Sequence, residues 1–465
     1  MKKTNLLVAC CCLFVNYLNA QPVKEKLQKA YAQFEADSQL RHAVSSLYVV
    51  NGKTGEVVFD KNSQIGLAPA STQKIITAAT AFELLGKDYK YKTKFGYEGE
   101  LKDSLLTGNI YIIGSGDPTL GSWRFENTKK EIIDRDFVQS LHRQKINLQR
   151  GSLIGTTGGF ETQKIPDGWI WEDIGNYYGA GCGQLNWNEN QFDLVLQTGQ
   201  NLNDSVKING TVPPLATEFL NELKTGKKGS GDNGYVYFSP VHSRYEVRGT
   251  EPCCADSVVI SGSALDNDLF TLNHFASVLR DNKFKEDQRP VHTAASKDYM
   301  NPKIFLTHTS PSLDSIIYWF LQKSINLYGE ALVKTFGYEK KGIGATDTGV
   351  VIMKDFWKQK GLDPEELNIK DGSGLSPQNR VTTHAQVEVL KYAKQQSWYP
   401  YFFNALPEYN NMKMKSGTIT DVKGFCGYHT SGDGTQYIFS FLVNNYNGPS
   451  STMVQKMYKV LDLLK

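Results

Sequence analysis

Three short polar motifs, far apart along the chain of 465 residues, constrain its fold more than any other feature. Ser71 and Lys74 stand three residues apart, Ser324 and Asn326 stand two apart, and a Lys-Ser-Gly tripeptide occupies residues 415–417. Their hydroxyl, amine and amide groups are of the kinds that nucleophilic catalysis uses. A site that contains all three motifs requires a fold that closes a separation of 253 positions between the first two serines, and a further 91 positions to the tripeptide.

The segment LAPASTQKIITAATAFELLG at 67–86 predicts a buried helix, because Pro69 precedes an apolar-periodic run that ends at Gly86. The spacing puts Ser71 and Lys74 on one helix face, about one turn apart. A serine hydroxyl is a weak nucleophile until a base removes its proton, and a lysine becomes such a base when apolar surroundings lower its pKa. Taken alone, this pattern is more simply explained by a capping serine and a solvated lysine.

Ser324 and Asn326 lie where two stretches of helical periodicity meet, one ending near Lys323 and the other beginning near Leu327. At such a break, a hydroxyl and an amide can face a cleft. The hydroxyl can relay a proton, and the amide can hold a substrate carbonyl. The alternative is an ordinary helix–helix turn that is capped by these two side chains.

A lysine, a hydroxyl residue and a glycine follow one another three times, at 53–55, 224–226 and 415–417. A functional copy needs an edge strand, where its ammonium and hydroxyl bind a carboxylate and its glycine lets a substrate approach the backbone. The first copy falls in the turn of a predicted β-hairpin, and the second leads into a charged loop. The third runs directly into strand-like sequence, so we expect it to be the functional copy.

Residues 1–20 have the pattern of a secretory signal peptide, with Lys2 and Lys3 before a short apolar run and a small residue before Gln21. Lipoprotein processing at Cys10 is the less favoured alternative. Removal of the signal peptide lowers the formal charge from +3 to +1. A nearly neutral chain gives no electrostatic case for nucleic-acid binding.

The pattern of helix-like and strand-like sequence divides the remaining chain into three parts. Mixed helical and strand patterns occupy 21–88 and 298–465, whereas short strand-like runs separated by Gly, Asn and Asp fill 89–297. We therefore predict one catalytic domain in two parts, interrupted by an insert of one or two mostly β domains. No Cys/His cluster has zinc spacing, and the sequence indicates neither a metal site nor a cofactor.

Four cysteines follow the predicted signal peptide: Cys182, Cys253, Cys254 and Cys426. Export would permit a disulfide between Cys182 and either Cys253 or Cys254. Buried free thiols are an equally good interpretation.

Ser-x-x-Lys, Ser-x-Asn and Lys-[Ser/Thr]-Gly, in this order, form the motif set of β-lactamases and penicillin-binding proteins. The separation between the first two motifs is far longer than in small β-lactamases. Further matching segments are GSGDPTL at 114–120, PDGWIWEDIGNYYGAG at 166–181 and DGSGLSPQN at 371–379. Over nearly its whole mature length the chain resembles the D-alanyl-D-alanine carboxypeptidase/endopeptidase family (peptidase S13, class C low-molecular-mass penicillin-binding proteins). The resemblance implies an α/β (α+β) fold with a β-lactamase/transpeptidase-like catalytic domain, in which helices flank an antiparallel sheet.

The resemblance also implies the catalytic roles. Ser71 would be the nucleophile that forms an acyl ester, Lys74 its general base and Ser324 a proton shuttle.

The resemblance assigns a second group of residues to substrate binding. Asn326 would bind the substrate amide, and Lys415 with Ser416 would bind the terminal carboxylate. Gly417 would admit the substrate to the backbone. The backbone N–H of Thr418, with that of the nucleophile, would form the oxyanion hole.

Three positions depart from the family pattern. Ser416 stands where threonine is usual, and Ile325 stands where the family often has aspartate. In this family an acidic residue of the insert can approach the cleft. The matching stretch LNWNENQF offers Asn188 instead, which leaves a binding role of the insert open.

The expected function is therefore that of a periplasmic serine DD-peptidase, acting on peptidoglycan stem peptides and acylated by β-lactams. One alternative is a β-lactamase or esterase on the same fold. Tyr409-Asn410-Asn411 imitates a motif of one β-lactamase class, but it lies too close to Lys415 to form a separate wall of the cleft. Another alternative is a non-catalytic penicillin sensor that binds the cell wall. Oligomeric state and peripheral membrane contact stay open.

Overall fold

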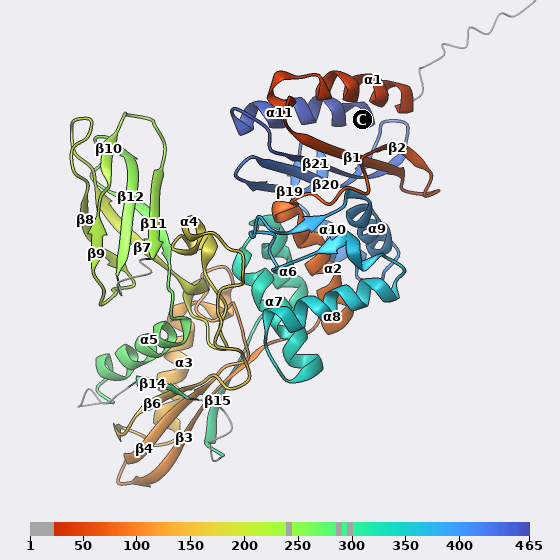
Figure 1. The fold of residues 1–465 in the computed structure, drawn as a ribbon. Helices are drawn as coiled ribbons and strands as arrows, with labels where there is room; N and C mark the ends of the chain where they lie inside the picture. Colours follow the sequence, from red (N-terminus) through yellow and green to blue (C-terminus); the bar gives the residue numbers. More distant parts are fainter. Residues whose placement is uncertain (1–22, 239–243, 285–290, 295–300) are drawn as a thin grey trace, which may run out of the picture.

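The computed structural model describes residues 23–238, 244–284, 291–294 and 301–465. The predicted signal peptide and Cys10 lie outside the described residues. Figure 1 shows a catalytic body, which contains both ends of the described chain, and an insert that extends away from it. Within the described ranges, no helix combines the length and apolar composition needed to cross a membrane.

The catalytic body is built on an antiparallel sheet of order β18-β19-β20-β21-β1-β2. The fifth strand in this order, β1, comes from the start of the chain and pairs with β21 near its end, so that Val44 lies opposite Asn444. The sheet confirms the predicted hairpin and the predicted fold class. The strands are β1 (Val44–Asn51), β2 (Val57–Lys61), β18 (Glu408–Tyr409), β19 (Met412–Ile419), β20 (Val422–Thr430) and β21 (Gln436–Asn444).

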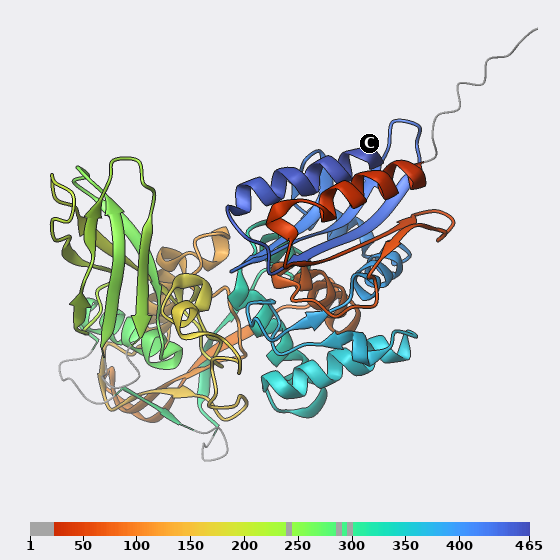
Figure 2. The ribbon, with the colours of Figure 1, turned by 45° about the horizontal axis from the view of Figure 1, so that its top comes forward.

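Helices cover both faces of this sheet. Along β21, Phe439 and Phe441 pack against the two terminal helices, whereas Ile438 packs against the other face, because side chains alternate along a strand. Figure 2 shows the terminal helices side by side on the outer face. They are α1 (Val23–Glu35) and α11 (Ser450–Leu461). The inner helices are α2 (Lys74–Leu85), α6 (Leu313–Gln322), α7 (Asn326–Lys341), α8 (Thr346–Gln359), α9 (Thr383–Lys394) and α10 (Tyr399–Ala405).

The first core of the insert is a mixed sheet of order β14-β6-β4-β3-β15, with β5 beside β4. Phe95, Phe137 and Phe275 pack with ring centroids 5.1–5.3 Å apart between this sheet and two helices. The chain enters through β3 and returns through β15, which pair antiparallel, so residues 303–309 belong to this sheet. The elements are β3 (Lys92–Lys102), β4 (Leu105–Ile113), β5 (Leu148–Arg150), β6 (Leu153–Thr156), β14 (Val291–Ala294), β15 (Lys303–Thr309), α3 (Lys130–Arg143) and α5 (Asn267–Asp281).

A second core of the insert lies between small β-sheets and contains Val236, Val247 and Ile260. The Lys-Thr-Gly copy at 224–226 forms strand β10 here, with Thr225 buried, and the charged loop that the sequence indicates begins only after Gly226. The strands are β7 (Gln191–Gln197), β8 (Lys207–Val212), β9 (Phe219–Asn221), β10 (Lys224–Gly226), β11 (Asn233–Phe238), β12 (Tyr245–Pro252) and β13 (Val258–Ser263). A short helix, α4 (Trp171–Ile174), precedes them, and β16 (Leu367–Asn368) pairs with β17 (Arg380–Val381) in the catalytic body.

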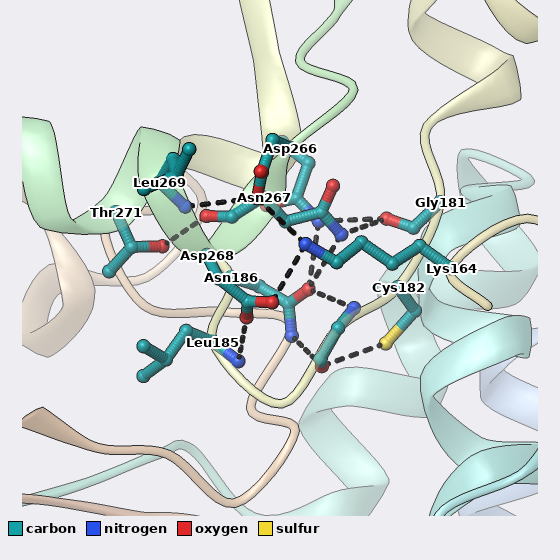
Figure 3. Close-up of polar contacts among 12 residues, drawn as sticks. Lys164, Gly181, Cys182, Leu185, Asn186, Asp266, Asn267, Asp268, Leu269 and Thr271 are labelled. Atoms are coloured by element: carbon teal, nitrogen blue, oxygen red, sulfur yellow. Dashed lines mark hydrogen bonds and ion pairs between the residues drawn. The ribbon is translucent and has the colours of Figure 1, made fainter. Parts of the chain in front are cut away.

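The loop that follows Gly181 is tied to the start of α5 by the polar contacts in Figure 3. The Lys164 ammonium lies 2.8 Å from Asp266 and 2.7 Å from Asp268. Asn267 Nδ2 donates to the Gly181 carbonyl over 2.7 Å. These contacts hold the loop that leads from α4 to β7.

The cysteines do not form the disulfide that the sequence made possible. Cys182, Cys253, Cys254 and Cys426 all carry free thiols, and Cys182 is buried, with its thiol donating to the Gly183 carbonyl.

Candidate active site

Ser71 and Lys74 lie in hydrogen-bond contact where a short 3₁₀ turn, Ala70–Gln73, passes into α2. Lys74 Nζ lies 2.8 Å from Ser71 Oγ, 2.6 Å from Asn326 Oδ1 and 2.7 Å from the Ser373 carbonyl. The last two oxygens only accept hydrogen bonds. They therefore take two N–H groups and leave the third position of the amine facing the serine hydroxyl.

Lys74 is completely buried. This burial, followed by the positive charge of Lys415, holds the pKa of the Lys74 ammonium well below its usual value, although nearby carboxylates oppose the shift. A neutral amine has one lone pair and two N–H groups, which matches the three partners. The arrangement can therefore take the proton of the Ser71 hydroxyl.

The backbone around the serine is strained and closely packed. Ala70, directly before it, has a φ of 46°, which is uncommon for a residue other than glycine. A Cβ atom at Gly417 would lie 2.6 Å from the Pro69 carbonyl and 3.0 Å from the Ser71 nitrogen. Only glycine lets β19 approach Ser71 this closely.

The Lys415-Ser416-Gly417 tripeptide lies in β19, where pairing with β18 covers only Met412 and Lys413. Residues 415–417 thus lie at an edge of the sheet, as the sequence predicts for a functional copy. The Lys415 side chain is buried and donates to the Ser416 carbonyl over 2.9 Å. Burial is the largest influence on this ammonium and lowers the pKa of Lys415 to about 7.

Ser324 and Asn326 occupy the break between α6 and α7, as the sequence indicates. Ser324 has a φ of 58°, and Asn326 begins α7. The Asn326 amide connects the two parts of the molecule, because its oxygen accepts from Lys74 and its nitrogen donates to the Tyr178 carbonyl of the insert over 2.8 Å.

A pocket of about 530 Å³ opens in front of these residues, between the catalytic body and the insert. Four of the eight predicted site residues line it: Ser71, Ser324, Asn326 and Thr418. Lys74 and Lys415 are buried behind its wall. Ser416 and Gly417 belong to the same strand as Thr418 without lining the pocket.

The acidic residues at the pocket are Glu172 and Asp173 of α4. Burial and then the neighbouring Glu172 raise the pKa of Asp173 to about 6. Asn188, which the sequence offered for this place, lines a different pocket, and its amide donates to the Gln191 carbonyl. The two adjacent acids in the aromatic segment 166–181 were the signal that could have identified this wall.

Sequence reasoning also missed the role of Asp371, a fully buried carboxylate behind the site. One of its oxygens accepts from Gln73, Asn379 and the Gly374 N–H, and the other accepts from Trp169 and the Ser376 N–H, over 2.6–3.1 Å. The donors come from the turn that carries Ser71, from the loop that supplies the Ser373 carbonyl, and from the insert. This carboxylate therefore holds the loop against Lys74.

Comparisons with known proteins agree with this architecture. A D-alanyl-D-alanine carboxypeptidase from Actinomadura sp. (strain R39) is 27% identical over 452 residues, covering 90% of this chain and 81% of the relative. DacB, a D-alanyl-D-alanine carboxypeptidase from Haemophilus influenzae, is 22% identical over 427 residues, covering 85% and 84%. The crystal structure of penicillin-binding protein 4 (dacB) from H. influenzae superposes with a TM-score of 0.79 at 20% identity, covering 95% of this chain and 99% of that one.

A second structure of that H. influenzae protein, complexed with a β-lactam, superposes with a TM-score of 0.73 at 18% identity and covers the same shares of the two chains. The family model for D-Ala-D-Ala carboxypeptidase 3 (S13) matches residues 27–462. The match confirms the resemblance drawn from the motifs, and the chain belongs to the D-Ala-D-Ala carboxypeptidase 3 (S13) family.

Proposed function

We propose that the protein is a serine D-alanyl-D-alanine carboxypeptidase that also cleaves D-alanyl cross-links of peptidoglycan. The observation that carries the proposal is the contact between Ser71 and a buried lysine whose remaining partners are two acceptor oxygens. Family membership supports the carboxypeptidase activity. The pocket between body and insert supports a peptide substrate that is longer than two residues.

The chemistry proceeds in two steps. Ser71 Oγ attacks the carbonyl carbon between two D-alanines while Lys74 takes the hydroxyl proton. The backbone N–H groups of Ser71 and Thr418 stabilise the oxyanion, and the proton returns through Ser324 to the leaving nitrogen as the C–N bond breaks. Water then hydrolyses the acyl ester. A β-lactam would acylate the same oxygen and open its ring.

The test is digestion of purified muropeptide monomers and cross-linked dimers, with the products identified by mass. We expect monomers to lose one D-alanine and dimers to separate into two monomers. Absence of both reactions would contradict the proposal. Rapid multiple-turnover hydrolysis of penicillin would instead favour a β-lactamase.

We further propose that residues 1–20 direct the chain to the periplasm, where peptidoglycan lies. The intact mass of the protein recovered from the periplasm shows whether residues 1–20 have been removed. A mass that includes them would contradict cleavage.

The activity should depend on pH through Lys415. Below pH 7 this side chain is protonated and attracts the terminal carboxylate of the substrate. As the pH rises through about 7, the free enzyme loses that charge. We expect kcat/KM for a substrate with a free D-alanine carboxylate to fall above about pH 7. A substrate that ends in a carboxamide should lack this alkaline decline, and identical profiles for both substrates would refute the assignment of Lys415.

Glu172 and Asp173 in the pocket wall favour a substrate that carries a free amino group, such as a diamino acid in the stem peptide. Asp173→Asn should raise KM for such a peptide about 10-fold, because it removes one charge-assisted hydrogen bond. The raised pKa of Asp173, about 6, implies that the difference between the variant and the wild type disappears below pH 6, where the carboxyl is neutral. The N-acetylated peptide serves as the control, since its KM should not respond to the substitution. An equal effect on both peptides would exclude recognition of the amine.

A further inference from the structure

A second pocket, of about 370 Å³, adjoins the catalytic pocket. The two pockets share Gln191 and Ser261 in their walls, so the second pocket is a groove that lies directly beside the catalytic pocket. The second pocket combines apolar rings and branched side chains with neutral amides and a hydroxyl. Its wall consists of Trp123, Lys130, Trp187, Asn188, Gln191, Asp193, Val212, Pro213, Pro214 and Ser261.

Trp123 supplies an exposed ring to this groove. Trp123 is 48% exposed, whereas tryptophan is highly buried on average. The Arg124 guanidinium lies over the Trp123 ring at 5.1 Å and is itself held by Glu189 through two hydrogen bonds. The Arg124 guanidinium therefore packs on the indole and is itself fixed by Glu189.

The floor of the groove is preorganised by a strained turn. Asn188, Glu189 and Asn190 have φ values of 53°, 52° and 52°, a run that residues other than glycine rarely adopt. The buried Glu189 carboxylate holds this turn, since it also accepts from Ser122 over 2.7 Å and from Tyr328 of α7 over 2.8 Å. The groove is thus anchored to the helix that begins at the catalytic amide.

The charges in the groove are few, one lysine and one aspartate. Asp193 accepts from Ser261 over 2.6 Å, and Lys130 lies 3.9 Å from Asp134. A free peptide segment with ionised carboxylates would find one cation in this wall, the exposed Lys130, and would also face the carboxylate of Asp193. An N-acetylated sugar suits it better, because the C–H face of a pyranose ring packs on indole and proline, and its hydroxyl and acetamide groups match neutral amides.

We propose that this second pocket is a subsite for the N-acetylated glycan to which the stem peptide is attached, with Trp123 as its stacking platform. The inference rests on the proposed function, since it concerns the part of the same substrate that lies beyond the peptide. The catalytic pocket would hold the peptide, and the shared Gln191 and Ser261 would mark the junction. Such a subsite would make the enzyme prefer peptides that are still attached to sugar.

The experiment compares kcat/KM for D-alanine release from a disaccharide-pentapeptide and from the same pentapeptide without sugar. The wild-type enzyme should prefer the glycosylated substrate by about 10-fold, the size expected for one well-packed aromatic contact. Trp123→Ala should abolish this preference and leave kcat/KM for the free pentapeptide unchanged. Trp123→Phe should restore part of it. Tyr401→Ala removes a similarly exposed ring that lines neither pocket and should retain the full preference.

The outcomes separate the two proposals. If neither substrate releases D-alanine, the proposed function fails. If both substrates react equally well in the wild type, or if Trp123→Ala keeps the preference, the glycan subsite is refuted while the peptidase assignment stands. If Trp123→Ala lowers kcat/KM only for sugar-free cross-linked dimers, a second stem peptide occupies the groove. That result also refutes the glycan subsite. If Trp123→Ala does not fold, competition by free N-acetylated disaccharide gives a second measurement. We expect the disaccharide to inhibit D-alanine release from the disaccharide-pentapeptide and not from the free pentapeptide.

Discussion

Replacing Ser71 by alanine is expected to abolish covalent labelling by penicillin and to lower D-alanine release by about 10⁴-fold or more. The reason is that the acyl ester has no other oxygen on which to form. The hydroxyl is the one partner of Lys74 that is able to give up a proton, since the other two are an amide oxygen and a carbonyl. Intact mass after incubation with penicillin, and release of D-alanine from muropeptides, measure the two effects.

Ser431→Ala is the matched control for this substitution, because that serine lies in a turn after β20 and its hydroxyl donates to the neighbouring Asp433. It should keep both labelling and turnover. An undiminished mass increase in Ser71→Ala would place the nucleophile elsewhere. Loss of turnover with retained labelling would contradict a common acyl-enzyme.

Replacing Asp371 by alanine is expected to lower the free energy of unfolding by about 3–5 kcal/mol, the range for breaking a buried charged network. Five donors would lose their acceptor, among them the indole of Trp169 and the amide of Gln73. The same change should release the loop that holds the Ser373 carbonyl on Lys74, so activity should fall even where the variant stays folded. Urea unfolding, followed by tryptophan fluorescence, measures the stability.

Asp355→Ala, at an exposed position of α8, should change stability by no more than about 0.5 kcal/mol. A loss for Asp371→Ala that is equally small would mean that water satisfies the orphaned donors and that the carboxylate does not hold the loop. The stability loss of Asp371→Asn should lie between those of Asp371→Ala and Asp355→Ala, because asparagine keeps one acceptor oxygen.

Much of the catalytic body could be predicted from local sequence. The apolar run that ends at Gly86 forms α2, and the break at Ser324 separates two helices as expected. These features depend on residues near one another in the chain. The fold class and the family could be identified because three motifs occur in a fixed order, and the roles of their residues stay predictions until the variants are measured.

The features that the sequence did not reveal depend on contacts between distant segments. Nothing local to Asp371 indicates that a tryptophan 202 positions earlier will donate to it. Thr225 is buried because β10 pairs in parallel with β12, and parallel pairing carries no short-range signal. Likewise, only the docking of α4 decides that Asp173, and not Asn188, reaches the catalytic pocket.

The pairing of β1 with β21 has a consequence for the order of events during synthesis. The nucleophile is made early, but β1 has no neighbour on one side until residues 436–444 have been made. Domains generally fold from the N-terminus as synthesis proceeds, whereas here the sheet is completed last. A chain that stops before residue 436 would carry Ser71 and Lys74 without the finished sheet on which their geometry depends. A complete active site is therefore expected only once residues 436–444 have joined the sheet.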